Sequence, residues 1–344
     1  MKSKLQYAFP LASLLTLLAG QQICADEPAP AKVETVVGGL DHPMALAVQP
    51  GTGMVFVSES GAGRICRLTP DSAVEVVGGF PTAALGSGEQ RLTLGPLGIA
   101  FADRNLLAVG TTAETAGTSP VRVYELPPSG PKIAAEKPKY AVALGQGDGK
   151  KATAIGNLFA LALDLPGKMV AGSFDSRHPD RGWLGRLDVS QERAGTLTPV
   201  IATGTEQPRA VAISPRGEWV TVEMSTADQF GRSLLKFYHP ETKKELLRLD
   251  TGLHDVSGLA YSPRTGWLYV TAAGQQDSAE SGVFRLDRDL IKGKPGVKPV
   301  RIAKLDRPTA LAFAPNGILY VAQLGKADSD KKQSGSVVRL IGRM

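Results

Sequence analysis

The chain has 344 residues, 42% of them hydrophobic and 21% charged, with 39 glycines and 24 prolines to supply turns, as in an ordinary soluble globular protein. Its formal net charge of +6 falls to +4 when an N-terminal segment with two lysines is set aside. A charge this small, scattered along the chain without a Lys/Arg-rich block or an aromatic platform, excludes a nucleic-acid-binding protein.

The first 25 residues have the features of a secretory signal peptide. Lys2 and Lys4 precede an apolar run over 7–20, and Ala25 stands directly before an acidic residue. A basic start, a short apolar centre and a small residue at the cleavage point are typical of export signals. We therefore expect cleavage after Ala25, a short flexible leader over 26–31, and a periplasmic or extracellular protein with no transmembrane segment in its mature chain. The alternative of a membrane anchor is disfavoured because the apolar run is short for a bilayer.

The cysteines agree with this interpretation. Cleavage removes Cys24 and leaves Cys66 alone, so that no intramolecular disulfide can form even in an oxidising compartment. Cys66 lies in the alternating segment 63–68, where we expect a small buried side chain. A lipid anchor on Cys24 is disfavoured because Ile23, which is not small, precedes it.

The mature chain repeats one unit, which is clearest over 307–340. There a strand over 309–313 leads through a Pro-Asn-Gly turn to a second strand over 318–322, and a third strand over 336–340 follows a polar loop. Alternating apolar and small or polar residues, β-branched and aromatic side chains and the Asn-Gly turn are hairpin signals.

Five more copies of this unit precede it, and all six copies have a small residue in the first strand. These residues are Ala45, Gly98, Ala160, Ala210, Gly258 and Ala310. Their spacings of 53, 62, 50, 48 and 52 residues are typical of propeller blades. The last copy lacks a fourth strand, and a strand over 32–37 can supply it, which closes the ring and removes an open sheet edge. The sequence therefore predicts an all-β protein: a six-bladed β-propeller over 32–344, with four antiparallel strands per blade and the N-terminal strand closing the last blade.

The repeat has a recognisable pattern, Pro-x-Ala/Gly-Leu-Ala-aromatic, then Pro-x-Gly and Leu-Tyr-Val-Ala. It resembles the superfamily of NHL-repeat, gluconolactonase (SMP-30) and sugar-quinoprotein propellers, over nearly all of the mature chain. The gluconolactonase resemblance would imply a divalent metal held by Glu, Asn and Asp at the entries to the first strands. The corresponding residues here, none of them a carboxylate or an amide, are Met44, Leu97, Phe159, Arg209, Ser257 and Thr309. A quinone cofactor would imply a basic His flanked by Arg and Lys, and His42 is the one candidate at a strand entry.

One rim of the propeller is the expected binding site. The starts of the first strands and the ends of the second strands meet there, with polar loops over 174–182, 225–232, 274–281 and 324–335. Long loops and convergent polar side chains over a central funnel are typical of ligand sites. The residues expected to contact a ligand are Asp175, Gln207, Arg209, Arg307 and Gln323.

A metal site on the same rim is a second expectation. The candidate ligands are His42, Glu59, Asn157, Glu223 and Asp255, and their oxygen-rich set favours Ca²⁺ or another divalent cation. His42 and Asp255 could instead act as a general base and the group that orients it. Both also suit turn residues that bond their own backbone.

Two classes of function follow from these residues. The leading interpretation is a secreted, monomeric propeller that binds a small ligand, a glycan or a protein partner on this rim without catalysing a reaction. The alternative is an enzyme: a metal-dependent, lactonase-like hydrolase with a rearranged site around His42, Asn157, Glu223 and Asp255, or a quinoprotein sugar dehydrogenase. The interpretation as a metal-dependent hydrolase predicts a tightly bound cation, whereas the interpretation as a binding protein predicts none.

Overall fold

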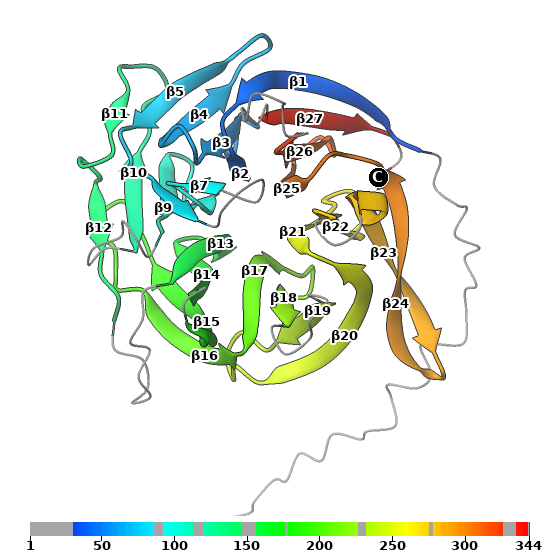
Figure 1. Cartoon of the computed structure of the whole chain (residues 1–344). Coiled ribbons are helices and arrows are strands. Elements are labelled where there is room, and N and C mark those ends of the chain that lie inside the picture. Colours follow the sequence, from blue (N-terminus) through cyan, green and yellow to red (C-terminus); the bar gives the residue numbers. More distant parts are fainter. Residues whose placement is uncertain are drawn as a thin grey trace, which may run out of the picture.

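The computed structural model describes residues 30–85, 92–112, 120–145, 156–175, 178–225, 232–274, 278–325, 335–342 and 344. Six sheets stand around one axis like blades (Figure 1). The 3-10 turn η3 (Ser278–Glu280) is the one helical element in these ranges, and no helix in them is long and apolar enough to cross a membrane. The predicted six-bladed, all-β propeller is confirmed.

Each blade runs from an inner strand beside the axis to an outer strand. In blade one these are β2 (Pro43–Val48), β3 (Val55–Glu59), β4 (Arg64–Leu68) and β5 (Ala73–Gly78). In blade two they are β8 (Ile99–Phe101), β9 (Leu106–Gly110), β10 (Val121–Glu125) and β12 (Tyr140–Val142). In blade three they are β13 (Asn157–Leu165), β14 (Lys168–Asp175), β15 (His178–Asp188) and β16 (Thr198–Gly204).

The second half of the ring has the same order. Blade four consists of β17 (Glu206–Ile213), β18 (Trp219–Ser225), β19 (Arg232–Tyr238) and β20 (Glu245–His254). Blade five consists of β21 (Val256–Tyr261), β22 (Leu268–Ala272), β23 (Gly282–Ile291) and β24 (Lys294–Ala303). Blade six consists of β25 (Pro308–Phe313), β26 (Leu319–Gln323) and β27 (Gly335–Ile341), with β1 (Lys32–Leu40) as its outer strand.

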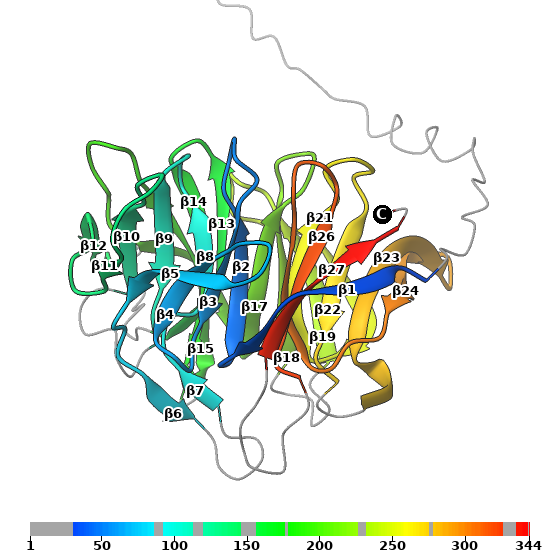
Figure 2. The same ribbon diagram turned by 90° about the horizontal axis from the view of Figure 1, so that it is seen from above.

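The two ends of the described chain close the ring. β1 pairs antiparallel with β27, from Lys32 opposite Ile341 to Leu40 opposite Gly335 (Figure 2). Because the last blade borrows its outer strand from the start of the chain, the sheet can open only by breaking this pairing. The predicted closure by the N-terminal strand is confirmed.

Three local features differ from the sequence-based prediction. A hairpin of β6 (Ala83–Leu85) and β7 (Leu92–Leu94) is inserted between blades one and two. The short strand β11 (Ile133–Ala134) pairs in parallel with β5 and gives blade one a fifth strand. The segment 174–182, predicted as a loop, continues β14 and β15 in the described residues, where Ser173 pairs with Trp183.

The inner strands are crowded where they face the axis. A Cβ atom added to Gly98 would lie 2.4 Å from the carbonyl oxygen of Phe159, and one added to Gly258 would lie 2.8 Å from Thr271 Oγ1. Only the smallest side chains fit such spaces without movement of the backbone. This crowding explains the small residue in each inner strand.

Four inner strands carry a one-residue bulge directly before this small residue. A bulge leaves one residue unpaired and re-aims its side chain. The extra residues are Met44, Arg209, Ser257 and Thr309. All four line the central channel.

Ring closure gives a first prediction. Leu340 in β27 is fully buried in the apolar cluster of blades five and six, whereas the next residue, Ile341, is 43% exposed. We expect Leu340→Ala to destabilise the protein by about 2–5 kcal/mol, because it leaves a cavity, and Ile341→Ala to change stability by less than about 1 kcal/mol. Denaturant unfolding of both variants measures this. Equal effects would contradict the packing of β27 described here.

Candidate functional site

The channel contains a cavity of about 280 Å³ at the rim where the inner strands begin. All six inner strands contribute to its wall, and Leu92 and Leu94 of β7 cover part of its mouth. The wall is mainly apolar. Its polar side chains are Gln207, Arg209, Ser257, Arg307 and Thr309.

Arg209 is fixed in the wall by aromatic rings. Its guanidinium carbon lies 4.2 Å from the ring centre of Phe174 and 5.9 Å from that of Phe159, and these two rings stack at 5.1 Å. Its hydrogen bonds are long, 3.4 Å to Gln207 Oε1 and 3.7 Å to Met224 Sδ. The faces of the guanidinium are thus used in stacking, while its N–H edge keeps the fork geometry that suits a carboxylate.

Burial changes the electrostatics of Arg209. Desolvation lowers its pKa to about 10, and the charge of Asp255 opposes this shift. A lowered pKa in a base means that its surroundings disfavour the positive charge. An anion placed in the cavity would offset that cost.

Arg307 brings a second positive charge to the same cavity. Desolvation lowers the pKa of this side chain too. Among the described residues its guanidinium has no hydrogen-bond or ion-pair partner, and no Asp or Glu of these residues lines the wall. The cavity therefore combines apolar walls with two cations and favours a negatively charged occupant.

Three residues adopt the left-handed conformation at the same place in their blades: His42 (φ 50°), Asp255 (φ 52°) and Arg307 (φ 53°). Each carbonyl accepts a hydrogen bond from the backbone N–H just beyond the second strand. The donors are Ser60, Ala273 and Leu324, at 3.0–3.1 Å. His and Asp tolerate this conformation better than most residues. His42 and Asp255 thus have the backbone conformation of turn residues.

Glu59, a predicted metal ligand, is held inside blade one. It accepts hydrogen bonds from Arg64 Nε at 2.8 Å and from the backbone N–H of Asp41 at 2.9 Å, and it is buried. Both carboxylate oxygens of Glu59 therefore accept hydrogen bonds inside the blade and do not face the channel. The alternation of side chains along β3 is the reason, since it points Glu59 to the face that carries Arg64.

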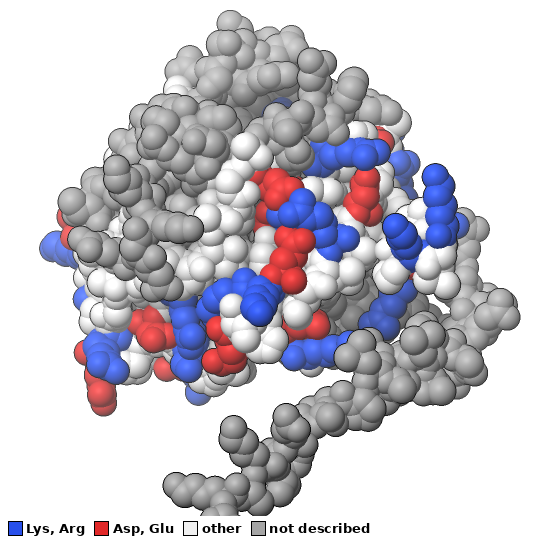
Figure 3. Space-filling model, turned by 90° about the horizontal axis from the view of Figure 1, so that it is seen from below, with Lys and Arg blue, Asp and Glu red and all other residues white. Residues whose placement is uncertain are grey.

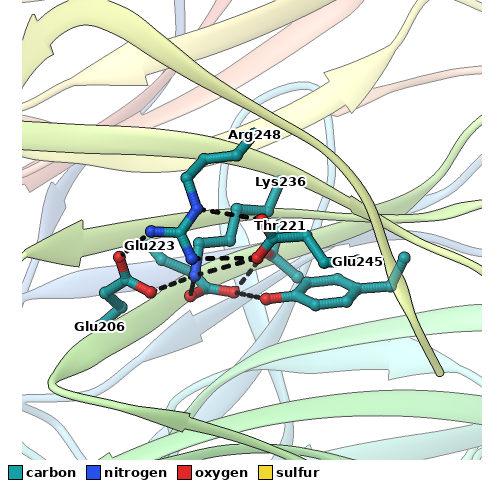
Figure 4. Close-up of polar contacts among 7 residues, drawn as sticks. Glu206, Thr221, Glu223, Lys236, Glu245 and Arg248 are labelled. Carbon is teal, nitrogen blue, oxygen red and sulfur yellow. Dashed lines mark hydrogen bonds and ion pairs between the residues drawn. The ribbon is translucent and has the colours of Figure 1, made fainter.

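Glu223 is held in the same way inside blade four. Fully buried, it accepts hydrogen bonds from Lys236 Nζ at 2.8 Å, Thr221 Oγ1 at 2.8 Å and Tyr238 Oη at 3.0 Å (Figure 4). Lys236 also contacts Glu206 and, at 3.8 Å, Glu245. Lys236 thus contacts two further carboxylates besides Glu223. The side chain of Glu223 lies in the blade interior and not in the channel.

The five predicted metal ligands do not converge. Asn157 is buried at the start of β13, and none of the five lines the cavity. Across the described residues no group of three or more His, Cys, Asp and Glu side chains could hold a metal ion. The predicted oxygen-rich site around His42, Glu59, Asn157, Glu223 and Asp255 is therefore not found in this part of the chain.

The residues of the cavity fit neither group implied by the resemblance. Its wall offers two guanidinium groups, one amide and two hydroxyls, whereas Ca²⁺ prefers carboxylate and carbonyl oxygens. A quinone site with His, Arg and Lys is not formed by the described wall, which contains no His or Lys. His42 lies outside it, with Nδ1 2.5 Å from Asp41 Oδ1 and with Nε2 buried.

The predicted ligand-contacting residues divide into three groups. Gln207, Arg209 and Arg307 meet in the cavity. Gln323 does not, because its amide is used by Ser336 Oγ at 2.9 Å and by the backbone of Asp306 at 3.2 Å. The side chain of Asp175 lies outside the described residues.

Three of the apolar wall residues that were not predicted lie outside the inner strands, on rim segments. These are Phe174, Leu92 and Leu94. Their signal in the sequence is the presence of large apolar residues in rim segments that otherwise read as polar loops. Such residues on a rim suggest that it is partly covered and not simply solvated.

The geometry defines a six-bladed β-propeller with a cationic, apolar cavity at one end of its channel. Neither a model of a protein family nor a curated protein matches the chain. Solved structures match it at low identity. A gluconolactonase of Xanthomonas campestris is 11% identical, with 94% of each chain covered and a TM-score of 0.60.

Two proteins with the names of sugar dehydrogenases have similar TM-scores. A proposed oxidoreductase (glucose dehydrogenase) of Thermus thermophilus is 19% identical over 90% of this chain and 100% of its own, with a TM-score of 0.59. The soluble aldose sugar dehydrogenase of Escherichia coli is 16% identical over 91% and 100%, with a TM-score of 0.58. These likenesses show that the chain has their propeller fold.

Glu223 gives a pH-dependent prediction. Burial raises its pKa above the ordinary 4.5, against the hydrogen bonds that it accepts. A carboxyl with a raised folded-state pKa contributes stability that is complete below the unfolded pKa and is lost as pH rises through the folded pKa. We therefore expect Glu223→Gln to lose less stability than the wild type between pH 4.5 and neutral pH, as measured by thermal unfolding.

The exposed Glu125, converted to Gln in the same way, serves as the control and should follow the wild-type curve. A constant stability difference between Glu223→Gln and the wild type across this range would show that Glu223 does not titrate there.

Proposed function

We propose that this protein binds a small organic acid in the cavity at the end of its channel. The observation that supports this is the pair Arg209 and Arg307 in a wall that is otherwise mainly apolar and has no described acidic residue. Charges in a partly desolvated cleft attract an opposite charge more strongly than charges in water.

The hydroxyl groups of the wall favour an acid that carries hydroxyls of its own. Thr309 Oγ1 donates to the carbonyl of Pro43 at 2.7 Å, and Ser257 Oγ donates to that of Pro308 at 2.8 Å. With their protons used, these oxygens can only accept hydrogen bonds from a ligand. The guanidinium groups would hold the carboxylate and the hydroxyl oxygens would accept from the ligand's OH groups.

The size of the cavity favours a ligand as small as a monosaccharide. Its volume of about 280 Å³ lies near the lower end of ligand pockets, which begin at roughly 300 Å³. A sugar acid such as gluconate combines this size with one carboxylate and several hydroxyls. It also agrees with the sugar-related names of the solved propellers of the same fold.

Hydrolysis of a sugar lactone is a second candidate. It is favoured by the fold shared with the Xanthomonas gluconolactonase over 94% of each chain. Opening of a lactone yields a sugar acid, so the same two arginines would hold the product. Binding and hydrolysis therefore share one site and differ only in whether the lactone is consumed.

Binding is tested by calorimetry with gluconate and with glucose, its uncharged relative. We expect gluconate to bind and both Arg209→Gln and Arg307→Gln to weaken it at least about tenfold, since a charged hydrogen bond contributes about 1.5–3 kcal/mol. Arg104→Gln, an exposed arginine in the β8–β9 turn at the opposite rim, is the matched control and should bind like the wild type.

The same proteins separate the two candidates. Acid release from gluconolactone that falls in Arg209→Gln would establish hydrolysis, and binding of gluconate without acid release would establish a binding protein. Unchanged affinity in both arginine variants, or no binding of any sugar acid, would rule out the cavity as this site.

We also propose that the chain is exported. The basic, apolar and small-residue order of residues 1–25 supports this. Intact-mass measurement of protein recovered from outside the cytoplasm should give a chain that begins at Asp26. Ala25→Asp, which removes the small residue at the cleavage point, should keep the full length. Full-length wild-type protein confined to the cytoplasm would contradict export.

A further inference from the structure

The end of the β23–β24 hairpin projects from blade five, at the lower right of the ring (Figure 1). Its two turn residues, Lys292 and Gly293, both have positive φ (51° and 75°), as a type I′ turn requires. Nearer the ring, Val297 packs with Leu249 and Leu253 of blade four. This contact holds the base of the hairpin and leaves its end in solvent.

The hairpin concentrates positive charge. Residues 288–304 contain six basic residues and one acidic residue, Asp289, so that this segment alone has a net charge of +5 in a chain of +6. The six exposed basic residues are Arg288, Lys292, Lys294, Lys298, Arg301 and Lys304. Basic side chains prevail at the right of Figure 3, on the side of blade five, whereas both signs are mixed near its centre.

Two large aliphatic side chains lie at the end of the same hairpin. Leu290 is 65% exposed, the highest value among the large hydrophobic residues of the described chain, and its neighbour Ile291 is 49% exposed. Successive residues of a strand point to opposite faces, so both sides of the hairpin end are apolar. Exposed aliphatic groups beside several cations favour a partner that is both apolar and anionic.

We propose that the end of this hairpin docks onto a bilayer that contains anionic phospholipids. Such a bilayer presents negative headgroups directly above an apolar layer, and lysine side chains can reach the headgroups while neighbouring aliphatic groups enter the interface. A protein partner is disfavoured by shape, because a stable interface buries about 800 Å² on each side and this narrow end offers two aliphatic side chains. The proposal does not depend on the ligand of the channel.

An environment-sensitive dye on Ile291→Cys reports the docking directly. The chain from Asp26 contains every described strand of the closed ring and only one natural cysteine. That cysteine, Cys66, is fully buried with its pKa raised to about 12, so it will not compete for the dye. We expect a blue shift with vesicles containing about one third phosphatidylglycerol, no shift with phosphatidylcholine alone, and reversal at about 0.5 M salt. A dye on Lys132→Cys, also exposed, should show no shift.

Co-sedimentation of unlabelled variants separates the two contributions. The double variants Leu290→Asp/Ile291→Asp and Lys292→Glu/Lys294→Glu should each lower partition onto anionic vesicles at least about tenfold. Leu246→Asp, which changes an aliphatic residue of β20 about as exposed as Ile291, is the matched control and should bind like the wild type.

Three results would overturn the proposal. These are equal binding to neutral and anionic vesicles, no binding to either, and wild-type binding by both double variants. Self-association that the hairpin variants abolish, without vesicle binding, would assign the surface to a second copy of the chain instead.

Discussion

The convergence of six inner strands on one axis is the constraint on which the rest of this structure depends. Where the strands are closest, Gly98 and Gly258 have no room for a larger side chain, and alanine fills the same place in the other blades. Chemistry at the axis must therefore come from the residues just before these positions. Bulges direct four of those side chains, one of them Arg209, into the channel. Crowding and bulging together decide what the channel can bind.

The buried charges of the protein form two groups with different consequences. Inside the blades each buried carboxylate has a cation beside it, as Glu59 has Arg64 and Glu223 has Lys236. Removing the cation of such a pair leaves the carboxylate buried without its counter-ion, which is strongly destabilising. In the channel the described wall provides cations without carboxylates, and burial lowers the pKa of Arg209 against the opposing charge of Asp255. The first group stabilises the fold, whereas the second leaves a charge for a ligand to neutralise.

This difference also explains which features of the structure could be predicted from the sequence. The fold was predictable because its signals are local: alternation with a period of two, a hairpin turn with Asn-Gly, and a small residue in each copy. The direction of a side chain at the end of a strand is not local, because one bulge residue reverses the alternation. Glu59 and Arg209 both lie near the rim, yet one turns into its blade and the other into the channel. Residue type alone does not separate them, so the metal site was expected where the structure places ion pairs.

The net charge of the whole chain likewise concealed where the positive charge lies. Spread over the mature chain, a net charge of +4 indicates no partner, and on that basis the basic residues appear scattered. Residues 288–304 contain six basic residues, and the pairing of β23 with β24 places this segment on one arm that projects from the ring. Exposed charges on such an arm act only over a distance of about 8 Å at physiological ionic strength, so they need a dense anionic surface. Arg209 and Arg307 are screened less in their cavity and can hold a single small anion. One chain can therefore carry two cationic sites that select partners of different size. Both sites are positively charged, but burial decides how strongly solvent and salt screen their charges.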